Sequence, residues 1–364
     1  TLIIPPHLTA VSNMPVASSS MVNNKHKRIV FEVTPPMSTY LLAFVVGELE
    51  YIEDVADDGT LLRVWTTPGK SSQGQFALAV TKQLLTYYND YFGIPYPLAK
   101  LDQLAIPDFA AGAMENWGAI TYREVALLFD PDNSSPRTRQ IIAEVVAHEM
   151  AHMWFGDLVT MDWWDDLWLN ESFASWMATK AVDHIYPEWD LWTQFVSSDV
   201  NTGLNLDGLE TSHPIRQEVN DPSEINQLFD AISYQKGASI LRMLEEFLGE
   251  AEFRRGLRRY LEDNAYKNAT GRDLWEAFEH ETGKPVISIM DSWIDQIGYP
   301  VIDVEVRRGD KSSILLTQSR FLYSGPNVDP TIWQIPVLVS GGDYDSETLV
   351  LMNDKEHILK GRSF

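Results

Sequence analysis

The segment SPRTRQIIAEVVAHEMAHMWFG, residues 135–156, decides how the rest of the chain is interpreted. Ser135 is a good helix N-cap and Pro136 suits the first helical position, so a helix is expected to begin here. It should run through Phe155 and stop at Gly156. The helix carries two histidines four residues apart, about one turn, so both rings should project from one face.

These histidines, His148 and His152, enclose Glu149 in an HExxH motif. Two neutral imidazoles at this spacing can share one Zn²⁺ ion at roughly 2.0–2.1 Å. A carboxylate beside them can take a proton from water that the zinc site activates. The motif therefore predicts metal-assisted hydrolysis. The simpler alternative is an amphipathic helix with two structural histidines.

A zinc site that activates water needs a third protein ligand and an open coordination position. The candidate is Glu171, nineteen residues after His152 on the next predicted helix, Trp168–Ile185. If the two helices pack antiparallel, Glu171 can reach the metal. It could instead be an ordinary acidic residue near a helix start, where the helix dipole favours it. Spacing also leaves open four rival carboxylates, Glu144, Asp162, Asp165 and Asp166.

Two further segments could contact a substrate. Gly112-Ala-Met-Glu-Asn116 follows a strand-like stretch, and its small residues would let an extended substrate hydrogen-bond to that edge. Glu115 would be a fixed negative charge there. Tyr234 starts a predicted helix, and its phenol could donate to an oxyanion near the metal. Taken alone, the two patterns are more common as a glycine-rich turn with a surface glutamate and as a packed tyrosine.

Five motifs together make the chain similar to the zinc aminopeptidases of family M1, the aminopeptidase N family of the gluzincin clan. They are GAMEN at 112–116, HEMAH at 148–152, NES at 170–172, SHPI at 212–215 and SYQKG at 233–237. Further family-like segments are VSNMP at 11–15, TPPMSTYLLAFVVGELEY at 34–51 and AIPDFAAGAMENWGAITYRE at 105–124. The likeness covers essentially the whole chain and looks closest to eukaryotic, fungal-type alanine/arginine aminopeptidases.

The resemblance implies a metal centre and two catalytic residues. His148, His152 and Glu171 would hold one Zn²⁺ ion per chain. Glu149 would activate water and then protonate the leaving amine. Tyr234 would stabilise the tetrahedral intermediate. The implied activity is hydrolysis of the first peptide bond of a peptide.

The resemblance also implies how such a peptide would be held. Glu115 would bind the free α-amino group, which would make the enzyme an exopeptidase. Gly112 and Ala113 would hold the substrate backbone, and Met114 would border the first side-chain pocket. The expected partners are therefore peptides with a free amino terminus.

The fold implied by the resemblance is α+β, with a thermolysin-like zinc metallopeptidase catalytic domain flanked by β segments. Residues 1–50 would end an amino-terminal β-domain, 51–298 would form the catalytic domain, and 299–364 a small β-sandwich domain. Local patterns agree, because β-rich runs near both ends predict strands. Apolar residues spaced by three and four predict helices near 73–93, 168–185, 222–249, 251–264, 271–282 and 286–297.

Composition excludes several classes of protein. The chain has 28 basic and 52 acidic residues, a net charge of −24, which opposes binding to nucleic acid or to an anionic membrane. It has no cysteine, so disulfides and cysteine nucleophiles are excluded. No apolar run approaches the ~20 residues that span a bilayer, and the amino terminus does not resemble a signal peptide. We therefore expect no membrane insertion and a cytoplasmic location.

The chain departs from the family pattern in three respects. Gln235 stands where the family usually has Glu, which should affect local hydrogen bonding. Most of the amino-terminal domain is expected to be missing. The large carboxy-terminal helical domain is expected to be missing as well, so the chain would be truncated at both ends. Two alternative functions follow: a truncated zinc-binding fragment with little turnover, or a leukotriene-A4-hydrolase-like dual activity on an epoxide.

Overall fold

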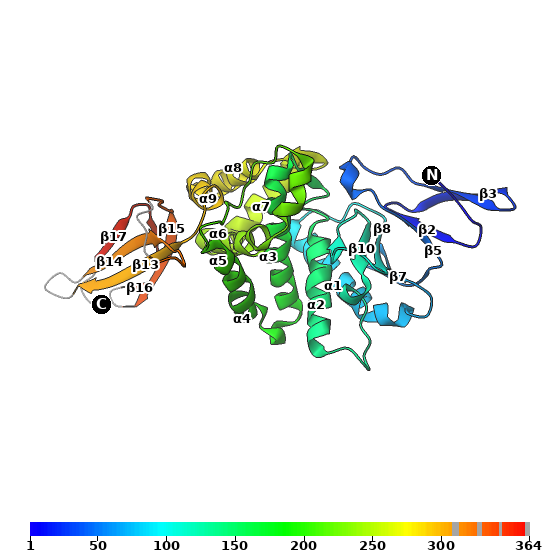
Figure 1. Ribbon diagram of the computed structural model, residues 1–364, viewed down its shortest axis with the longest axis horizontal. Helices are drawn as coiled ribbons and strands as arrows, with labels where there is room; N and C mark the ends of the chain where they lie inside the picture. Colours follow the sequence, from blue (N-terminus) through cyan, green and yellow to red (C-terminus); the bar gives the residue numbers. More distant parts are fainter. Residues whose placement is uncertain (308–312, 326–329, 342–343, 361–364) are drawn as a thin grey trace. The chain divides into compact units, whose positions relative to one another are not determined.

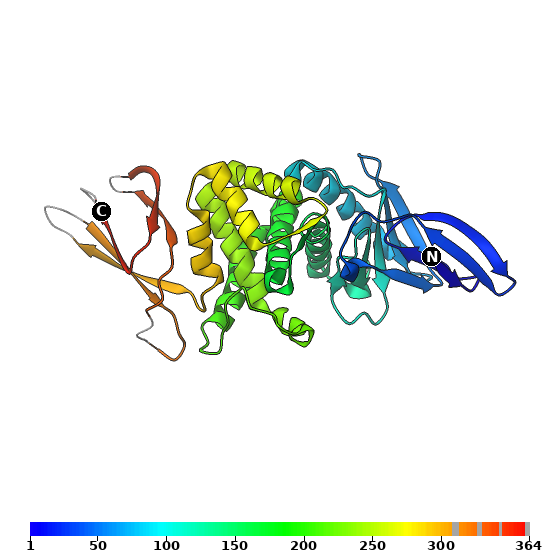
Figure 2. The same cartoon turned by 90° about the horizontal axis from the view of Figure 1, so that it is seen from above.

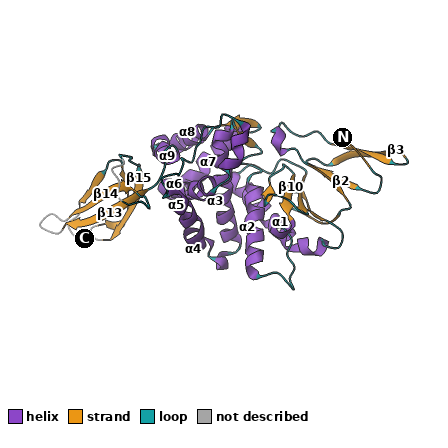
Figure 3. Ribbon diagram, in the orientation of Figure 1, coloured by secondary structure: helices purple, strands orange, loops and turns teal. Residues whose placement is uncertain are grey.

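The computed structural model describes residues 1–307, 313–325, 330–341 and 344–360. It has the predicted α+β fold: most strands belong to the first 123 residues and to the region after 299, and most helices lie between them in the chain (Figure 3). Contacts divide the chain into two compact units. Unit 1 comprises Thr1–Asp162, Ala174–Trp192 and Leu261–Ala269, and unit 2 comprises Trp163–Phe173, Thr193–Tyr260 and the described residues from Thr270 onward.

The central sheet of unit 1 has the strand order β6-β7-β8-β10-β9. The strands are β6 (Glu50–Val55), β7 (Leu61–Thr66), β8 (Lys100–Ile106), β10 (Ala119–Arg123) and β9 (Ala113–Met114). β7, β8 and β10 run parallel, whereas β6 and β9 pair antiparallel at the two edges. Ala113 and Met114 of the GAMEN segment therefore form an edge strand of the described sheet.

Helices α1 (Gln75–Phe92) and α2 (Pro136–Ala151) contact each other in unit 1 (Figure 1). The hydroxyl of Tyr88 donates to the carbonyl oxygen of Ala147 at 2.8 Å. The ring of Tyr88 also packs against Trp154, with centroids 5.8 Å apart. Both residues are fully buried, so an aromatic core holds the end of α2, where the HExxH motif lies.

Helix α2 begins as predicted and ends earlier. The Ser135 hydroxyl accepts a hydrogen bond from the Thr138 amide at 3.1 Å, with Pro136 in the first turn. The helix ends at Ala151, four residues before the expected end, and His152 is its C-cap. The backbone of His152 is still helical, with φ −59° and ψ −23°, so the four-residue spacing of the histidines keeps its geometric meaning.

Strands fill much of the first 50 residues, as predicted (Figure 2). One antiparallel sheet has the order β1-β4-β3, with β1 at Leu2–Ile4, β4 at His26–Phe31 and β3 at Val16–Asn23. Strand β2 (Thr9–Ser12) pairs with β5 (Phe44–Gly47). Asn13, from the VSNMP motif, is buried and donates to the carbonyl oxygens of Leu41 and Trp117 at 2.8 and 2.9 Å. Because Trp117 directly follows GAMEN, Asn13 ties these strands to the edge of the central sheet.

Unit 2 contains most of the remaining helices. The prediction is confirmed for α7, α8 and α9, which are Glu250–Asn264, Gly271–Thr282 and Val286–Ile294. The sequence patterns did not indicate two short helices, α4 (Leu191–Phe195) and α5 (Asn201–Asp207). In the described part of the chain, no helix is both long and apolar enough to cross a bilayer.

The prediction of a single helix near 222–249 is wrong. The region forms a 3₁₀ helix, η7 (Pro222–Leu228), a π-helix, η8 (Ile232–Lys236), and then α6 (Gly237–Leu248). The backbone leaves the helical region at Phe229, where ψ is 73°. The carboxylate of Asp230 then accepts the amides of Ile232 and Ser233, which starts a new helical segment.

The strands expected after 299 are present, as β13 to β17 (Figure 1). The sheet β13-β14-β17 comprises Pro300–Arg307, Ser313–Arg320 and Glu356–Lys360, and β15 (Ile335–Gly341) pairs with β16 (Tyr344–Met352). Their core contains Leu316, Trp333, Ile335, Met352 and Leu359. Parts of the predicted sandwich, 308–312, 326–329, 342–343 and 361–364, lie outside the described residues. The domain boundaries at 50 and 298 stay a prediction.

Candidate active site

The two histidines of HExxH face each other at the end of α2. Their rings are nearly perpendicular, with centroids 4.8 Å apart, and the two Nε2 atoms lie 3.1 Å from each other. Two nitrogens bound tetrahedrally to one Zn²⁺ would be about 3.3 Å apart, given zinc–nitrogen bonds of roughly 2.0–2.1 Å. The spacing of His148 and His152 therefore suits one shared ion.

The other ring nitrogen of each histidine has its own neighbour. His152 Nδ1 lies 2.9 Å from the carbonyl oxygen of Phe155. Because a carbonyl can only accept, Nδ1 carries the proton and Nε2 keeps a lone pair for a metal. His148 Nδ1 lies 3.4 Å from the hydroxyl oxygen of Ser175, a weaker contact. These contacts orient both rings toward a common point.

The third predicted ligand, Glu171, belongs to helix α3 (Leu167–Ile185), which contributes residues to both units. Ser175, which contacts His148, is one helical turn after Glu171, so the two side chains share a face of α3. His148, His152 and Glu171 each offer a ligand atom, and these atoms lie within 4.8 Å of one another. The carboxylate of Glu171 is buried.

Three of the four rival carboxylates have other partners in the described structure. Asp165 accepts the Val219 amide at 2.6 Å, and Asp166 accepts the Gly271 amide at 3.1 Å. Glu144 accepts from the Gln140 side chain at 2.5 Å. Asp162 is exposed. Among the described residues, none of these four belongs to a group that could hold a metal ion.

A second cluster of ligand-type side chains joins Glu115 and Glu149 to His152. One atom from each of the three lies within 4.8 Å of the others, and all three side chains are buried. Glu115 reaches this cluster from the end of edge strand β9. The cluster shares His152 with the first one, so the candidate amine-binding carboxylate and the candidate base lie beside a candidate metal ligand.

Strand β10 places the GAMEN edge next to α2. Ala113 pairs with Tyr122 in the β9–β10 register, and the Gly112 carbonyl accepts the Arg123 amide at 2.9 Å. Burial raises the pKa of the Tyr122 phenol well above its usual range, and the nearby charge of Glu149 adds to this effect. The Asn116 side chain accepts the Thr121 hydroxyl at 2.9 Å. The predicted substrate edge is therefore held by its neighbouring strand.

The patterns in the sequence did not single out Asp157, which lies among these groups. It is 1 % exposed, and within the described part of the chain neither carboxylate oxygen has a hydrogen-bond partner. Burial raises its pKa well above the usual range; the charges of Glu115 and Glu149 raise it further, while His152 opposes them. An aspartate inside the apolar run Trp154–Val159 is the signal that could have revealed it.

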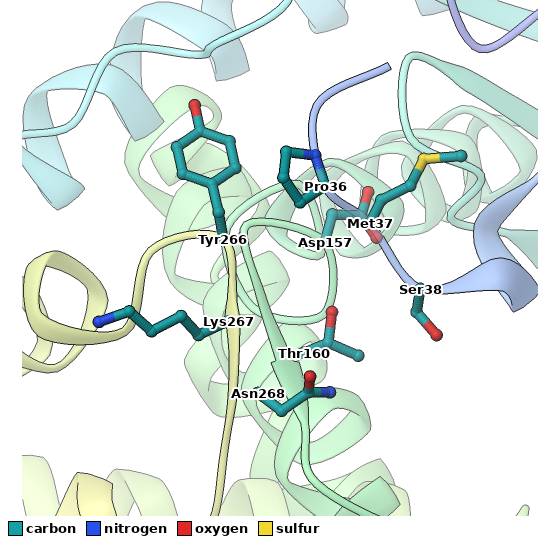
Figure 4. A pocket seen from close by; sticks show the side chains of 8 residues that line it. All are labelled: Pro36, Met37, Ser38, Asp157, Thr160, Tyr266, Lys267 and Asn268. Carbon is teal, nitrogen blue, oxygen red and sulfur yellow. The ribbon is translucent and has the colours of Figure 1, made fainter. Parts of the chain in front are cut away.

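Asp157 also borders a cavity of about 200 Å³ in unit 1 (Figure 4). Figure 4 shows the Lys267 side chain pointing away from Asp157, and its Nζ donates to the Asp263 carbonyl at 3.0 Å. Both carboxylate oxygens are buried and have no hydrogen-bond partner among the described residues. Protonation is one way to compensate such a buried charge.

Tyr234 lies in unit 2, on the π-helix η8. Its side chain is half-buried and its ring lies 6.5 Å from that of Phe229, between centroids. The Tyr234 amide donates to the Asp230 carbonyl at 3.1 Å. π-helical turns are rare and are frequently found at functional sites. The predicted role of Tyr234 stays a prediction.

Comparison with known proteins gives one consistent result. A sequence profile described as "Peptidase family M1 domain" matches residues 76–293. Similar relatives include "Aminopeptidase M1" of Arabidopsis thaliana, 49% identical over 98% of this chain; "Puromycin-sensitive aminopeptidase" of Caenorhabditis elegans, 45% over 95%; and "Alanine/arginine aminopeptidase" of Saccharomyces cerevisiae, 46% over 98%. The chain spans 40%, 37% and 41% of the lengths of these relatives, respectively.

Proposed function

Because the chain belongs to peptidase family M1, we propose that it carries the catalytic centre of a zinc aminopeptidase that removes the first residue of peptides with a free amino terminus. The observation that supports this most is the shared His152. It belongs both to the group with His148 and Glu171 and to the group with Glu115 and Glu149. A metal ligand set, a base and an amine anchor are thus close enough to act on one peptide bond.

The donor set suits Zn²⁺. Two imidazole nitrogens and one carboxylate, from His148, His152 and Glu171, are a common ligand set of catalytic zinc, which leaves a coordination position open. When bound, Zn²⁺ would polarise the scissile carbonyl and lower the pKa of water toward neutrality. The buried surroundings strengthen such electrostatic effects, because they exclude solvent.

Glu149 acts in this proposal as the general base and then as the general acid. Its carboxylate takes a proton from the attacking water and later delivers it to the nitrogen of the leaving amine. Its position next to His148 in α2 keeps it beside the ligand set. Tyr234 donates its hydroxyl proton in a hydrogen bond to the oxyanion that develops on the attacked carbonyl.

Glu115 accounts for the exopeptidase character of the proposed reaction. Glu115 is buried, and its carboxylate can form a direct ion pair with the ammonium group of a free amino terminus. A blocked amino terminus carries no charge and loses this contact. Gly112 and Ala113 precede Glu115, and Ala113 lies on the edge strand, where an extended peptide can add as a further strand. Met114 follows Ala113 and would border the pocket for the first side chain of the substrate.

The test is hydrolysis of fluorogenic alanine, leucine and arginine amides, with zinc content measured on the same preparation. Glu149→Gln should retain about one zinc per chain and lose about 10²–10⁴-fold in kcat, because general base catalysis typically contributes that much. Glu144→Gln, on the same helix but in neither cluster, is the matched control and should keep its activity. N-acetylated substrates should be cleaved poorly by the wild-type chain.

Three outcomes would contradict the proposal. Zinc bound by the wild-type chain without any hydrolysis would leave a metal-binding fragment of a longer enzyme. Equal cleavage of N-acetylated and free substrates would remove the amine anchor. Activity that survives Glu149→Gln would exclude Glu149 as the base.

A further inference from the structure

The SHPI motif, residues 212–215, has no role in the function proposed above, although it belongs to the same unit as Tyr234. We propose that His213 and Asp230 are positioning residues that hold the π-helix η8, and with it the Tyr234 hydroxyl, in the geometry needed for oxyanion stabilisation. This inference rests on the proposed role of Tyr234. It is carried by contacts at the start, the end and the side of η8.

Asp230 organises the start of η8. One carboxylate oxygen, Oδ1, accepts the backbone amides of Ile232 and Ser233 at 2.9 and 3.1 Å. The carbonyl oxygen of the same residue accepts the Tyr234 amide at 3.1 Å. Three successive amides, including that of Tyr234, are therefore anchored to one residue. A change in the position of Asp230 would move the tyrosine backbone directly.

His213 fixes Asp230 in turn. Its Nε2 lies 2.6 Å from Asp230 Oδ2, and its Nδ1 lies 2.8 Å from the carbonyl oxygen of Pro214. Both of these neighbours are acceptors, so a protonated, positively charged ring can donate to each of them; the Gln217 side-chain nitrogen lies farther away, 3.5 Å from Nε2. Burial opposes this charge, but the hydrogen bonds to Asp230 and Pro214 raise the pKa of His213 overall. The SHPI segment thus clamps the carboxylate that starts η8.

A second contact from the same motif reaches the end of η8. Lys236, the last residue of η8, is buried and forms an ion pair with Asp207 at 2.8 Å. Asp207 also accepts the hydroxyl of Ser212 at 2.7 Å. Neighbouring residues of SHPI, Ser212 and His213, therefore hold opposite ends of the segment that carries Tyr234. A contact at only one end would leave the tyrosine free to pivot.

The side of η8 is fixed by helix α3. The hydroxyl of Ser172 donates to the carbonyl oxygen of Ser233 at 2.5 Å. A Cβ atom at Gly237, directly after η8, would lie 1.8 Å from the same Ser172 oxygen, so the two backbones approach closely. The ends and the side of η8 are thus each held by a named contact, and the backbone that carries Tyr234 is held with them.

The first experiment compares hydrogen exchange in the wild-type chain and in His213→Ala. We expect amides in the peptide covering Asp230–Gly237 to exchange faster in the variant. Arg216→Ala is the matched control: Arg216 lies three residues after His213 and pairs with Asp295 at 2.8 Å, away from η8. It should leave exchange in this peptide unchanged. Equal exchange in wild type and His213→Ala would overturn the proposal, whether or not the chain is active.

The second experiment asks whether His213 acts through Tyr234. His213→Ala should lower kcat about tenfold with KM within about twofold, because a small misplacement weakens a contact made in the transition state. In a Tyr234→Phe background the same substitution should cause no further loss, since the hydroxyl it positions is gone. His213→Gln can still donate a hydrogen bond to Asp230 and should recover part of the rate. This variant keeps the test valid if the alanine variant fails to fold.

The kinetic outcomes separate this inference from the proposed function. An equal loss from His213→Ala in both backgrounds would overturn positioning and leave the aminopeptidase proposal standing. An active wild-type chain whose Tyr234→Phe variant keeps full kcat would overturn the role of Tyr234 and the positioning with it. A wild-type chain without activity contradicts the proposed function, while hydrogen exchange still decides whether His213 holds η8.

Discussion

The hydroxyl of Ser172 donates a 2.5 Å hydrogen bond to the carbonyl oxygen of Ser233. Ser172 directly follows the candidate metal ligand Glu171, and Ser233 directly precedes Tyr234. The contact therefore couples helix α3 to the π-helix η8 at the residues next to two candidate site groups. A buried side chain thus links two segments about sixty residues apart in the chain.

Gly237→Ala tests how closely the backbone at Gly237 approaches Ser172 on helix α3. At an ordinary helical glycine the substitution stabilises by up to about 1 kcal/mol, but here the new Cβ would lie 1.8 Å from Ser172 Oγ. We expect destabilisation by about 1–3 kcal/mol, measured by urea unfolding, because overpacking displaces backbone. The double variant with Ser172→Gly should recover part of this loss. Unchanged or increased stability of the single variant would show that the two backbones separate easily.

Asp157→Asn should stabilise the protein, and more so as pH rises. The folded-state pKa of Asp157 is raised, so the folded chain keeps a proton that the unfolded chain loses above about pH 4. Stability of the wild type therefore falls with rising pH up to the folded-state pKa, by up to about 1.4 kcal/mol per unit from this residue. Asparagine has no such proton to lose.

The measurement for this prediction is the difference in unfolding free energy between Asp157→Asn and wild type at pH 5, 6, 7 and 8. The difference should grow in favour of asparagine. Groups that do not interact with Asp157 titrate alike in both proteins and cancel in the comparison. A difference that is constant with pH would mean that Asp157 is ionised in the folded state.

Ser175→Ala should weaken zinc binding. Ser175 Oγ lies 3.4 Å from His148 Nδ1, and loss of such an orienting contact typically costs 10–100-fold in metal affinity. Because the contact is long, we expect about tenfold, measured by competition with a chelator. Thr179→Val, one turn further along α3, is the control and should bind zinc like wild type. Equal affinities in all three proteins would show that Ser175 does not orient His148.

Asp102→Asn should destabilise unit 1 strongly. Asp102 is buried and lies 2.6 Å from Arg63 and 2.7 Å from Lys100. Burial lowers the pKa of Lys100, and the charge of Asp102 opposes this shift. Removing one partner of a buried ion pair costs about 3–5 kcal/mol, because the remaining charge is uncompensated. Asp54→Asn, which breaks an exposed pair with Lys82, should leave thermal unfolding unchanged. Similar midpoints of thermal unfolding for Asp102→Asn and Asp54→Asn would contradict the predicted importance of the buried ion pair.

Much of the fold could be predicted from local patterns. Ser135 and Pro136 specify the start of α2, and Thr270 begins α8 with a capping box, because these side chains act on amides only two or three residues away. The break at Phe229 could not be predicted in the same way. The apolar spacing of 222–249 suits one helix, and it does not reveal that the Asp230 carboxylate accepts the Ile232 amide or that His213, from another segment, contacts this carboxylate.

The candidate site was predictable in part. His148, Glu149 and His152 share one turn, so their proximity follows from helix geometry. Glu171 could not be chosen over Asp165 or Asp166 by spacing, because the choice depends on which carboxylates are used by Val219 and Gly271. The resemblance to family M1, carried by GAMEN, HEMAH and NES, pointed to Glu171, and the family itself is confirmed by the profile match.

The sequence alone determined what depends on short distances along the chain: the helix that presents HExxH, the strands near both ends, the acidic balance and the family. Only the tertiary structure decided which residues meet across the chain. It brought Glu115 to His152, buried Asp157 with no hydrogen-bond partner among the described residues, and joined SHPI to the π-helix of Tyr234. The physical reason is that helix periodicity and capping act within one turn, whereas burial and ion pairing depend on the packing of distant segments.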